Sequence, residues 1–273
     1  MGETRFDQFF SKSEDQGEEI EKIEATIPFS GVDSVIVKNI NGHMSISTWD
    51  REELSVKAIK KVKFSNALKG REYAKEVTVK IETVGRQIEI VTQHPQGSPP
   101  NSIKGVSVEY TIKMPPKSDL DASNVNGSIS VTGLNGAVKA TTSNGSVMLD
   151  AIHGNALAKS ANGSITAKLS RLEEGSEFET VNGSIEVSAS DAHFVPIHAE
   201  TVNGSISLAI PSTFAADLDA HVISGSITCN FPITIRGKLD RRSLRGTING
   251  GGAEIILKTV HGNITLVRVA GKE

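Results

Sequence analysis

Two glutamates have a spacing that would suit acid–base chemistry. When the repeats of this sequence are aligned, Glu179 and Glu200 fall in one column, one repeat apart, which for stacked strands is roughly 5 Å. Paired carboxylates at that separation are typical of retaining glycosidases. Lys159 on one side and His221 on the other give a simpler interpretation, a solvated column with compensating charges. The other candidate carboxylates are scattered: Asp150, Glu173, Glu174, Asp191, Asp217 and Asp219.

The histidines and the lone cysteine do not combine into a metal site. His153, His193, His198, His221 and His261 recur in the second half of the chain, but His198 and His261 do not share a column with His221. Cys229 stands where neighbouring repeats carry valine or leucine, so we interpret it as a small buried hydrophobic residue. The sequence therefore predicts no catalytic residue, no cofactor-binding residue, no metal ligand and no cofactor.

A basic, glycine-rich stretch near the C-terminus could bind an anion. Glycine-rich backbone can surround a phosphate, but this stretch has no Walker pattern and no helix clearly follows it. We prefer a structural interpretation, an insertion that covers the open end of a stack of strands. The stretch runs over residues 236–252 and contains Lys238, Arg241, Arg242, Arg245, Gly246, Gly250, Gly251 and Gly252.

A repeat of about twenty residues must position all of these side chains. Its corners are Asn126-Gly127-Ser128-Ile129, Asn144-Gly145-Ser146-Val147, Asn162-Gly163-Ser164-Ile165, Asn182-Gly183-Ser184-Ile185, Asn203-Gly204-Ser205-Ile206, Ser224-Gly225-Ser226-Ile227 and His261-Gly262-Asn263-Ile264. From Gly127 to Gly225 the glycines are 18, 18, 20, 21 and 21 residues apart. A fixed period of this length predicts a β-solenoid.

Each repeat predicts two strands and two corners. Asn-Gly favours a turn because both residues tolerate positive φ. The alternating runs after the turn, such as Ile129-Ser130-Val131, predict half-buried strands. Before the turn, a Thr or Ser column (Thr142, Ser160, Thr180, Thr201) is expected to form hydrogen bonds along the stack. We interpret the asparagine column as a corner ladder that satisfies turn backbone groups, in preference to a metal-binding or ice-binding ladder.

The exposed columns are polar and varied. They are Ser130, Met148, Thr166, Glu186, Ser207 and Thr228 after the turn, and Thr141, Lys159, Glu179, Glu200, His221 and Lys258 before it. A periodic glycan or an ice lattice would favour identical residues, so varied columns suit a protein partner or simple solubility better.

The chain before the repeats is also rich in predicted strands. We expect residues 1–22 to be a flexible acidic segment and residues 23–117 to be a β-rich cap with a short helix near 66–76. Residues 34–49 are expected to form a hairpin around Asn41-Gly42, with Trp49 against the core. Residues 118–235 are the predicted solenoid. Residues 236–273 are the predicted glycine-rich capping insertion followed by the last rung, a rung being one turn of the solenoid. We expect the cap to pack on the first rung through Val108, Tyr110 and Ile112.

Composition excludes several classes of function. The 273 residues carry a formal net charge of -3, and aromatic residues make up only 4%. A clustered basic surface for nucleic acid is not indicated, nor are stacking platforms for sugars or bases. No run has the length of a transmembrane helix, and residues 1–5 lack the basic and then apolar start of a signal peptide.

The ordered set of motifs resembles the "putative adhesin" family of bacterial β-strand-repeat proteins (domain of unknown function 4097). The resemblance covers residues 24–268, and rests on the opening motif at 35–54, the Asn-Gly-Ser-Ile corners, and the ending at 244–252 followed by 259–264. It implies an all-β, single-chain β-solenoid with no catalytic residues. It also implies a place in the cell envelope or a secreted protein of the periplasm or cell surface, with a cytoplasmic location left open.

The sequence thus predicts a non-enzymatic envelope or surface protein that presents a flat face to a protein or a cell-envelope polysaccharide. The alternative is a structural or regulatory scaffold, stress-sensing or oligomerising. A polysaccharide-acting enzyme is the third hypothesis. The oligomeric state and the handedness of the coil are left undetermined by the sequence.

Overall fold

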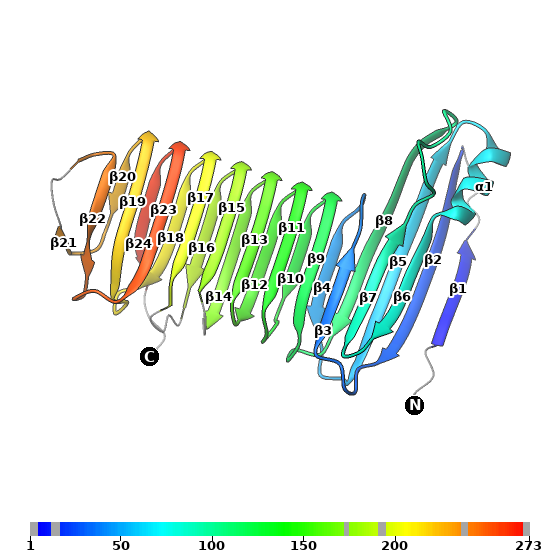
Figure 1. Ribbon diagram of the computed structural model, residues 1–273, viewed down its shortest axis with the longest axis horizontal. Helices are drawn as coiled ribbons and strands as arrows, with labels where there is room; N and C mark the ends of the chain where they lie inside the picture. Colours follow the sequence, from blue (N-terminus) through cyan, green and yellow to red (C-terminus); the bar gives the residue numbers. More distant parts are fainter. Residues whose placement is uncertain (1–4, 12–16, 172–174, 191–194, 236–239, 270–273) are drawn as a thin grey trace.

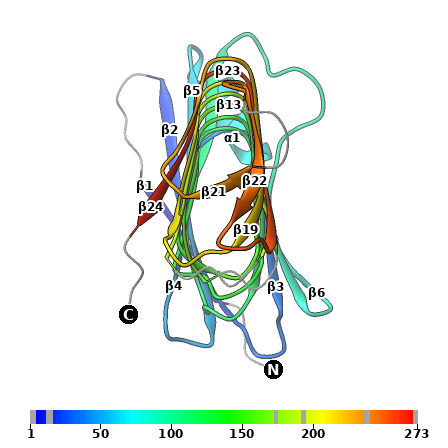
Figure 2. The ribbon, with the colours of Figure 1, turned by 90° about the vertical axis from the view of Figure 1, so that its left-hand side faces the viewer.

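Two twelve-stranded sheets face one another along the whole molecule. The computed structural model describes residues 5–11, 17–171, 175–190, 195–235 and 240–269. Figure 1 shows the strands stacked side by side along the long axis, and Figure 2, viewed along the stack, shows the flattened coil that they form. The prediction of an all-β solenoid is confirmed.

The order of strands in each sheet defines the architecture. Sheet A runs β1 (Arg5–Ser11), β2 (Glu18–Pro28), β5 (Glu53–Phe64), β8 (Ile103–Met114), β4 (Met44–Thr48), β10 (Ile129–Thr132), β12 (Val147–His153), β14 (Ile165–Arg171), β16 (Ile185–Ala189), β18 (Ile206–Pro211), β24 (Ile264–Val269) and β20 (Ile227–Cys229). Sheet B runs β21 (Ile233–Ile235), β22 (Ser243–Ile248), β19 (Ala216–Ser224), β23 (Ala253–His261), β17 (Ile197–Asn203), β15 (Ser176–Asn182), β13 (Ala156–Asn162), β11 (Val138–Asn144), β9 (Asp119–Asn126), β3 (Ser34–Lys38), β7 (Gln87–Gln93) and β6 (Thr78–Val84).

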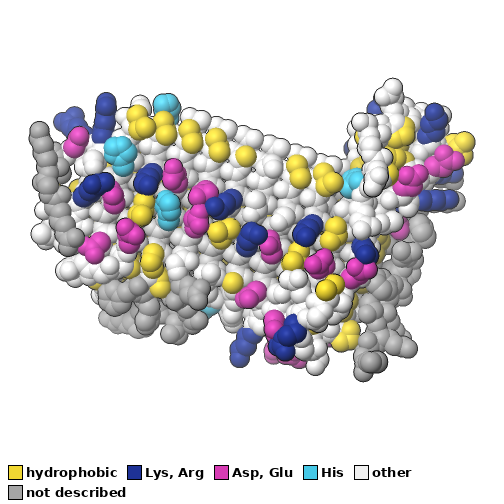
Figure 3. Space-filling view, in the orientation of Figure 1, with side chains coloured by type: hydrophobic (Ala, Val, Ile, Leu, Met, Phe, Trp, Pro, Cys, Tyr) yellow, Lys and Arg dark blue, Asp and Glu magenta, His cyan; other side chains and the backbone are white. Residues whose placement is uncertain are grey.

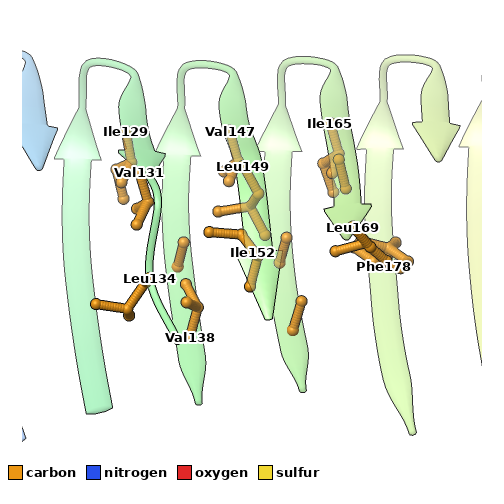
Figure 4. Packing of buried hydrophobic residues seen from close by; sticks show 14 of the residues in the cluster. Ile129, Val131, Leu134, Val138, Val147, Leu149, Ile152, Ile165, Leu169 and Phe178 are labelled. Carbon is orange, nitrogen blue, oxygen red and sulfur yellow. The ribbon is translucent and has the colours of Figure 1, made fainter. Parts of the chain in front are cut away.

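A rung consists of one strand of sheet B, a corner, and one strand of sheet A. Eight such rungs stack in parallel register: β3–β4, β9–β10, β11–β12, β13–β14, β15–β16, β17–β18, β23–β24 and β19–β20. Alternate side chains point between the sheets, because side chains of a strand alternate in direction. Figure 4 shows Val131, Leu149 and Phe178 in this core, and all three are buried. The alternation in the sequence therefore identified the inward face correctly.

Close backbone approach, more than positive φ, explains the corner glycines. A Cβ at Gly183 would lie 2.2 Å from the carbonyl oxygen of Gly163, and one at Gly163 would lie 2.0 Å from that of Gly145. The φ angles of Gly145, Gly163, Gly183 and Gly204 lie outside the left-handed region, although those of Gly127 and Gly225 lie within it. Glycine is required in this column because the next corner occupies the space of a side chain.

The Thr and Ser column bonds to these same corners. The sequence had suggested that these hydroxyls bond to one another along the stack, but they do not. Instead each donates to the corner carbonyl of the preceding rung: Thr142 to Gly127 (3.0 Å), Ser160 to Gly145 (2.8 Å), Thr180 to Gly163 (2.8 Å) and Thr201 to Gly183 (2.8 Å). The inward-pointing hydroxyl thus satisfies a carbonyl group of the turn.

The corner asparagines form a ladder of side-chain amides. Each Nδ2 donates to the Oδ1 of the preceding rung, from Asn203 through Asn182, Asn162, Asn144 and Asn126 to Asn41, at 2.8 to 2.9 Å. A corner ladder was predicted, but its partners are other asparagines and not turn backbone groups. Every one of these amides is at least partly exposed, so each bond contributes little on its own.

Replacing Asn162 with alanine breaks two links of this ladder. We expect the free energy of unfolding to fall by about 1 to 2 kcal/mol, because each of the two lost hydrogen bonds contributes about 0.5 to 1 kcal/mol. Urea denaturation would measure this, with Asn101→Ala in the exposed loop before β8 as the matched control. An equal effect of the two substitutions would contradict a stabilising ladder.

Residues 34–48 form the first rung of the solenoid and not a hairpin. β3 lies in sheet B, parallel to β9 and β7, while β4 lies in sheet A, parallel to β10 and β8. The Asn41-Gly42 motif is therefore a solenoid corner, because the two strands that it joins belong to opposite sheets. The strands of residues 23–117 continue the same two sheets coaxially.

A buried polar network joins this rung to the N-terminal strands. Thr92 donates to Asn39 Oδ1 (2.9 Å), Tyr110 and Thr92 share a hydrogen bond of 2.7 Å, and Asn39 donates to the carbonyl of Val108 (2.8 Å). Burial raises the pKa of Tyr110 to about 12. Val108, Tyr110 and Ile112 are buried in the shared core as expected, although their strand, β8, pairs with β4.

The first residues do not form a flexible lead-in throughout. Residues 5–11 form β1, which pairs antiparallel with β2, and β2 begins at Glu18, before the predicted start of the β-rich region at residue 23. Trp49 is half-buried, with the Arg51 guanidinium 4.9 Å from its ring centroid, so it lies at the surface and does not cap the core. The predicted helix is confirmed as α1 (Ala67–Glu76), capped by Asn66.

The order of rungs along the chain is not their order in space. β23 lies between β17 and β19, and β24 lies between β18 and β20. The sequence had suggested consecutive stacking with the 253–269 repeat as the last rung. Instead, the rung β19–β20 lies beyond β17–β18 and not next to it. The later rung β23–β24 occupies the position between them. β22 and β21 extend sheet B beyond β19, in agreement with a covering role for part of the glycine-rich stretch.

Candidate interaction surfaces

The outer face of sheet B carries linked charges along the stack. Lys139 donates to Asp121 at 2.8 Å. One rung further, Lys159 lies 2.8 Å from both Glu177 and Glu179. The hydrogen bonds that Lys159 donates to Glu177 and Glu179 raise the pKa of Lys159. Figure 3 shows these mixed charges across the middle of the stack.

The predicted pair of glutamates is adjacent in space. Glu179 and Glu200 are register partners on β15 and β17, as the repeat alignment indicated. The neighbour of Glu200 on the other side is Lys258 and not His221, because β23 is inserted there. Hydrogen bonding with Glu179 and Lys159 lowers the pKa of Glu177 beside this pair. The carboxylates lie on an open strand surface and are engaged with basic side chains, an arrangement suited to recognition.

A shallow groove crosses the same face near its N-terminal end, and no feature of the sequence had indicated it. It has a volume of about 300 Å³ and is lined by residues of β3, β9, β11 and β13, among them Ile36, Asp121, Lys139 and Leu157. Neither Glu179 nor Glu200 lines it. The repeats show which residues share a column, but a groove forms only where the side chains of one column are smaller than those of the columns beside it.

A second groove of about 390 Å³ lies between α1 and the loop before β8. Its lining includes Lys69, Glu72, Tyr73, Glu76 and Pro100. Two proline residues of this loop, Pro95 and Pro100, line one wall of the groove.

The histidines are dispersed. His198 lies 3.5 Å from Glu200, His221 pairs in register with Lys258, and His261 occupies the asparagine column beside Asn203. His153 is exposed at the opposite corner, and His193 lies outside the described residues. Among the described residues, no group of three or more His, Cys, Asp or Glu side chains is arranged to hold a metal ion.

The other sequence candidates are also separate. Arg245 is paired with Asp219 at 3.1 Å, Arg241 and Arg242 are exposed, and Lys238 lies outside the described residues. Asp150 lies 3.9 Å from Lys168 on sheet A. Asp217 lies on β19, whereas Glu173, Glu174 and Asp191 are outside the described residues. Cys229 is half-buried, not fully buried, and burial raises the pKa of its thiol.

Comparison with solved structures found distant likenesses over nearly the whole chain. A "putative cell adhesion protein" from Clostridium sporogenes is 13% identical, with 98% of this chain and 100% of that chain covered and a TM-score of 0.37. A "putative adhesin" from Bacteroides fragilis is 10% identical, with 98% of each chain covered and a TM-score of 0.42. A "putative lipid binding protein" from Parabacteroides distasonis is 11% identical, with 93% and 98% covered and a TM-score of 0.38.

Residues 3–267 match the model of a protein family, Toastrack DUF4097. No curated protein matches the sequence. Within the described part of the chain, no helix has the length and apolar character needed to cross a membrane.

Proposed function

The chain belongs to the Toastrack DUF4097 family, and from this premise we propose that it is a non-enzymatic protein of the cell envelope or cell surface. Its outer face on sheet B contacts a protein or a cell-envelope polysaccharide. The observation that carries the proposal is the continuous face formed by eight parallel strands, β3 to β19, with linked charges along it.

The rigidity of this face supports a binding role. In sheet B, the strands β9, β11, β13, β15, β17 and β23 are each hydrogen-bonded to a neighbouring strand on both sides. The corner side-chain amides and backbone carbonyls are also hydrogen-bonded between rungs. The backbone of such a scaffold keeps its position, so little backbone conformational entropy is lost when a partner binds. The columns vary from rung to rung, which suits a protein partner better than a uniform glycan lattice.

The chemistry of the charged residues supports recognition over catalysis. Glycosidases need one carboxylic acid with a raised pKa beside a second carboxylate. Here the pKa of Glu177 is lowered, and Lys159 is hydrogen-bonded to both Glu177 and Glu179. We accordingly expect that replacing Glu179 or Glu200 with alanine leaves any measured hydrolytic activity unchanged.

Co-sedimentation with isolated bacterial envelopes and insoluble cell-wall polymers tests the proposal, at low and at high salt. The face variant combines Lys159→Ala with Glu200→Ala on sheet B. The control combines Lys168→Ala with Glu186→Ala on sheet A, and so removes the same two charge types. We expect saturable binding by the unmodified protein and by the control. Binding by the face variant is expected to be about three- to thirtyfold weaker, because it loses two contacts of a few tenths to about 1 kcal/mol each.

Equal binding by the two variants would contradict a role for sheet B. Absence of binding to every fraction would overturn the proposal and favour the scaffold hypothesis, in which the partner is a soluble protein.

A further inference from the structure

One corner of the solenoid carries an exposed stripe in which most side chains are apolar. The stripe consists of the residues that precede the asparagine column, in spatial order Ile40, Val125, Ser143, Ala161, Val181, Val202, Val260 and Ile223. Val125 is 41% exposed, Val181 45%, Val202 38% and Ile223 56%. Figure 3 shows a straight row of hydrophobic side chains along the upper edge of the stack.

The columns on the sheet A side of this stripe carry no Asp, Glu, Lys or Arg, whereas the next outward column on the sheet B side contains Lys159, Glu179, Glu200 and Lys258. The asparagine column continues through His261 and Ser224, and the next side-chain column reads His43, Ser128, Ser146, Ser164, Ser184, Ser205, Asn263 and Ser226. Together with the corner glycines, the three columns form a neutral band. The band itself is uncharged, unlike the face of sheet B that adjoins it, and exposed apolar surface rimmed by polar residues is typical of an interaction site.

We propose that the neutral band is a self-association surface, and that its partner is the neutral band of a second copy of this chain. A row with an apolar side chain on seven of its eight rungs, which are about 4.8 Å apart, fits a surface with the same repeat, and a second copy has that repeat by identity. Two uncharged bands also meet without like-charge repulsion. A membrane surface is less suited, because interfacial binding uses basic and aromatic side chains that the band lacks.

The size of the band determines the strength of the contact. Seven inter-rung spacings give a length of about 34 Å, and four residues across the corner give a width of about 13 Å. The outline of roughly 450 Å² per copy is below the 800 Å² per partner of a standard stable interface. The association is therefore weak and reversible, and it becomes populated where copies are concentrated.

The shape of the molecule selects an antiparallel arrangement. Figure 1 shows β8 and the elements near α1 rising above the upper edge at the N-terminal end of the stack. Two copies with their stripes parallel would bring these projections together. A two-fold axis perpendicular to the stripe places each projection beyond the far end of the other copy, and such a closed two-fold pair is the commonest form of homodimer.

Sedimentation velocity over a concentration series tests the association. We expect the unmodified chain to shift from monomer towards dimer at tens to hundreds of micromolar, and a variant with Val181→Lys and Val202→Lys to stay monomeric throughout. The control, Ser123→Lys with Thr141→Lys, adds the same charge on sheet B and keeps the association. The proposal would be overturned if the unmodified chain stayed monomeric, or if the control lost association as completely as the Val181→Lys, Val202→Lys variant.

Disulfide trapping tests the arrangement in a Cys229→Ser background. A mixture of Ile40→Cys and Ile223→Cys proteins is expected to give cross-linked heterodimers, because these residues are at opposite ends of the stripe. Each protein alone is expected to give little product, since its two cysteines would be about 34 Å apart in the dimer. Efficient cross-linking of either protein with itself would overturn the antiparallel arrangement, and binding of the monomer to neutral lipid vesicles through the band would overturn the choice of partner.

Discussion

Gly183→Ala is expected to lower the free energy of unfolding by about 3 to 5 kcal/mol, which for a chain of this size is a fall of roughly 10 °C in Tm. The added Cβ would lie 2.2 Å from the carbonyl oxygen of Gly163, 2.5 Å from its carbonyl carbon and 2.9 Å from the backbone nitrogen of Ser164. All three atoms are backbone, so no side chain can rotate away. The corner below is packed equally closely on Gly145, so a displacement must extend along the column.

Gly105→Ala is the matched control for this experiment. Gly105 lies in β8 with open space where a Cβ would be, and its φ is outside the left-handed region. Alanine there is expected to be neutral or to stabilise the fold by up to about 1 kcal/mol, because it restricts the unfolded chain. Thermal and urea denaturation of both variants measure the difference. A small effect at Gly183 would show that the corners have more freedom than their spacing indicates.

Leu257→Ala is expected to cost about 2 to 5 kcal/mol, even though Leu257 belongs to the last repeat in the sequence. Its side chain is 0% exposed, because β23 is inserted between β17 and β19. The corner of the same rung is bonded on both sides, with Gly204 donating to His261 and Gly262 donating to Ser224. Removal of the side chain therefore leaves a cavity inside the stack and not at its end.

Ile235→Ala provides the comparison at the true end of sheet B. Ile235 precedes Leu257 in the sequence, but it lies on the edge strand β21 and is 42% exposed. Its replacement is expected to change the free energy of unfolding by no more than about 0.5 kcal/mol. Similar effects of the two substitutions would contradict the inserted position of the C-terminal rung. Amide hydrogen exchange should agree, with slower exchange in β23 than in β21.

These features bear on how the proposed surfaces would work. The inserted rung carries Lys258 on the charged face of sheet B and Val260 on the neutral band, so both surfaces run through β23 without a gap. If the C-terminal rung were the outermost one, as its place in the sequence suggested, Glu200 would adjoin His221 instead. The position of this rung therefore determines which charges are neighbours on the candidate binding face.

The sequence by itself determined the fold class, the rung and the inward residues. This was possible because parallel in-register stacking brings each repeat onto an equivalent position of the next, so Glu179 and Glu200 are adjacent simply because their repeats are consecutive. The alternation in runs such as Ile129-Ser130-Val131 indicated which side chains are buried, since the period of a strand is two. α1 was found because its residues and its Asn66 cap are local signals.

Only the tertiary structure decided what depends on contacts between distant segments. Asn41-Gly42 has the local features of a hairpin turn, but the partners of β3 and β4 are β9 and β10, more than eighty residues away in the sequence, and their pairing makes it a corner. The sequence could not show that β23–β24, and not β19–β20, lies next to β17–β18. The two rungs have a similar corner motif and the same pattern of inward residues, so either could occupy that position. Local patterns specify a strand and its buried face, whereas its neighbours in a sheet are selected by the packing of the whole chain.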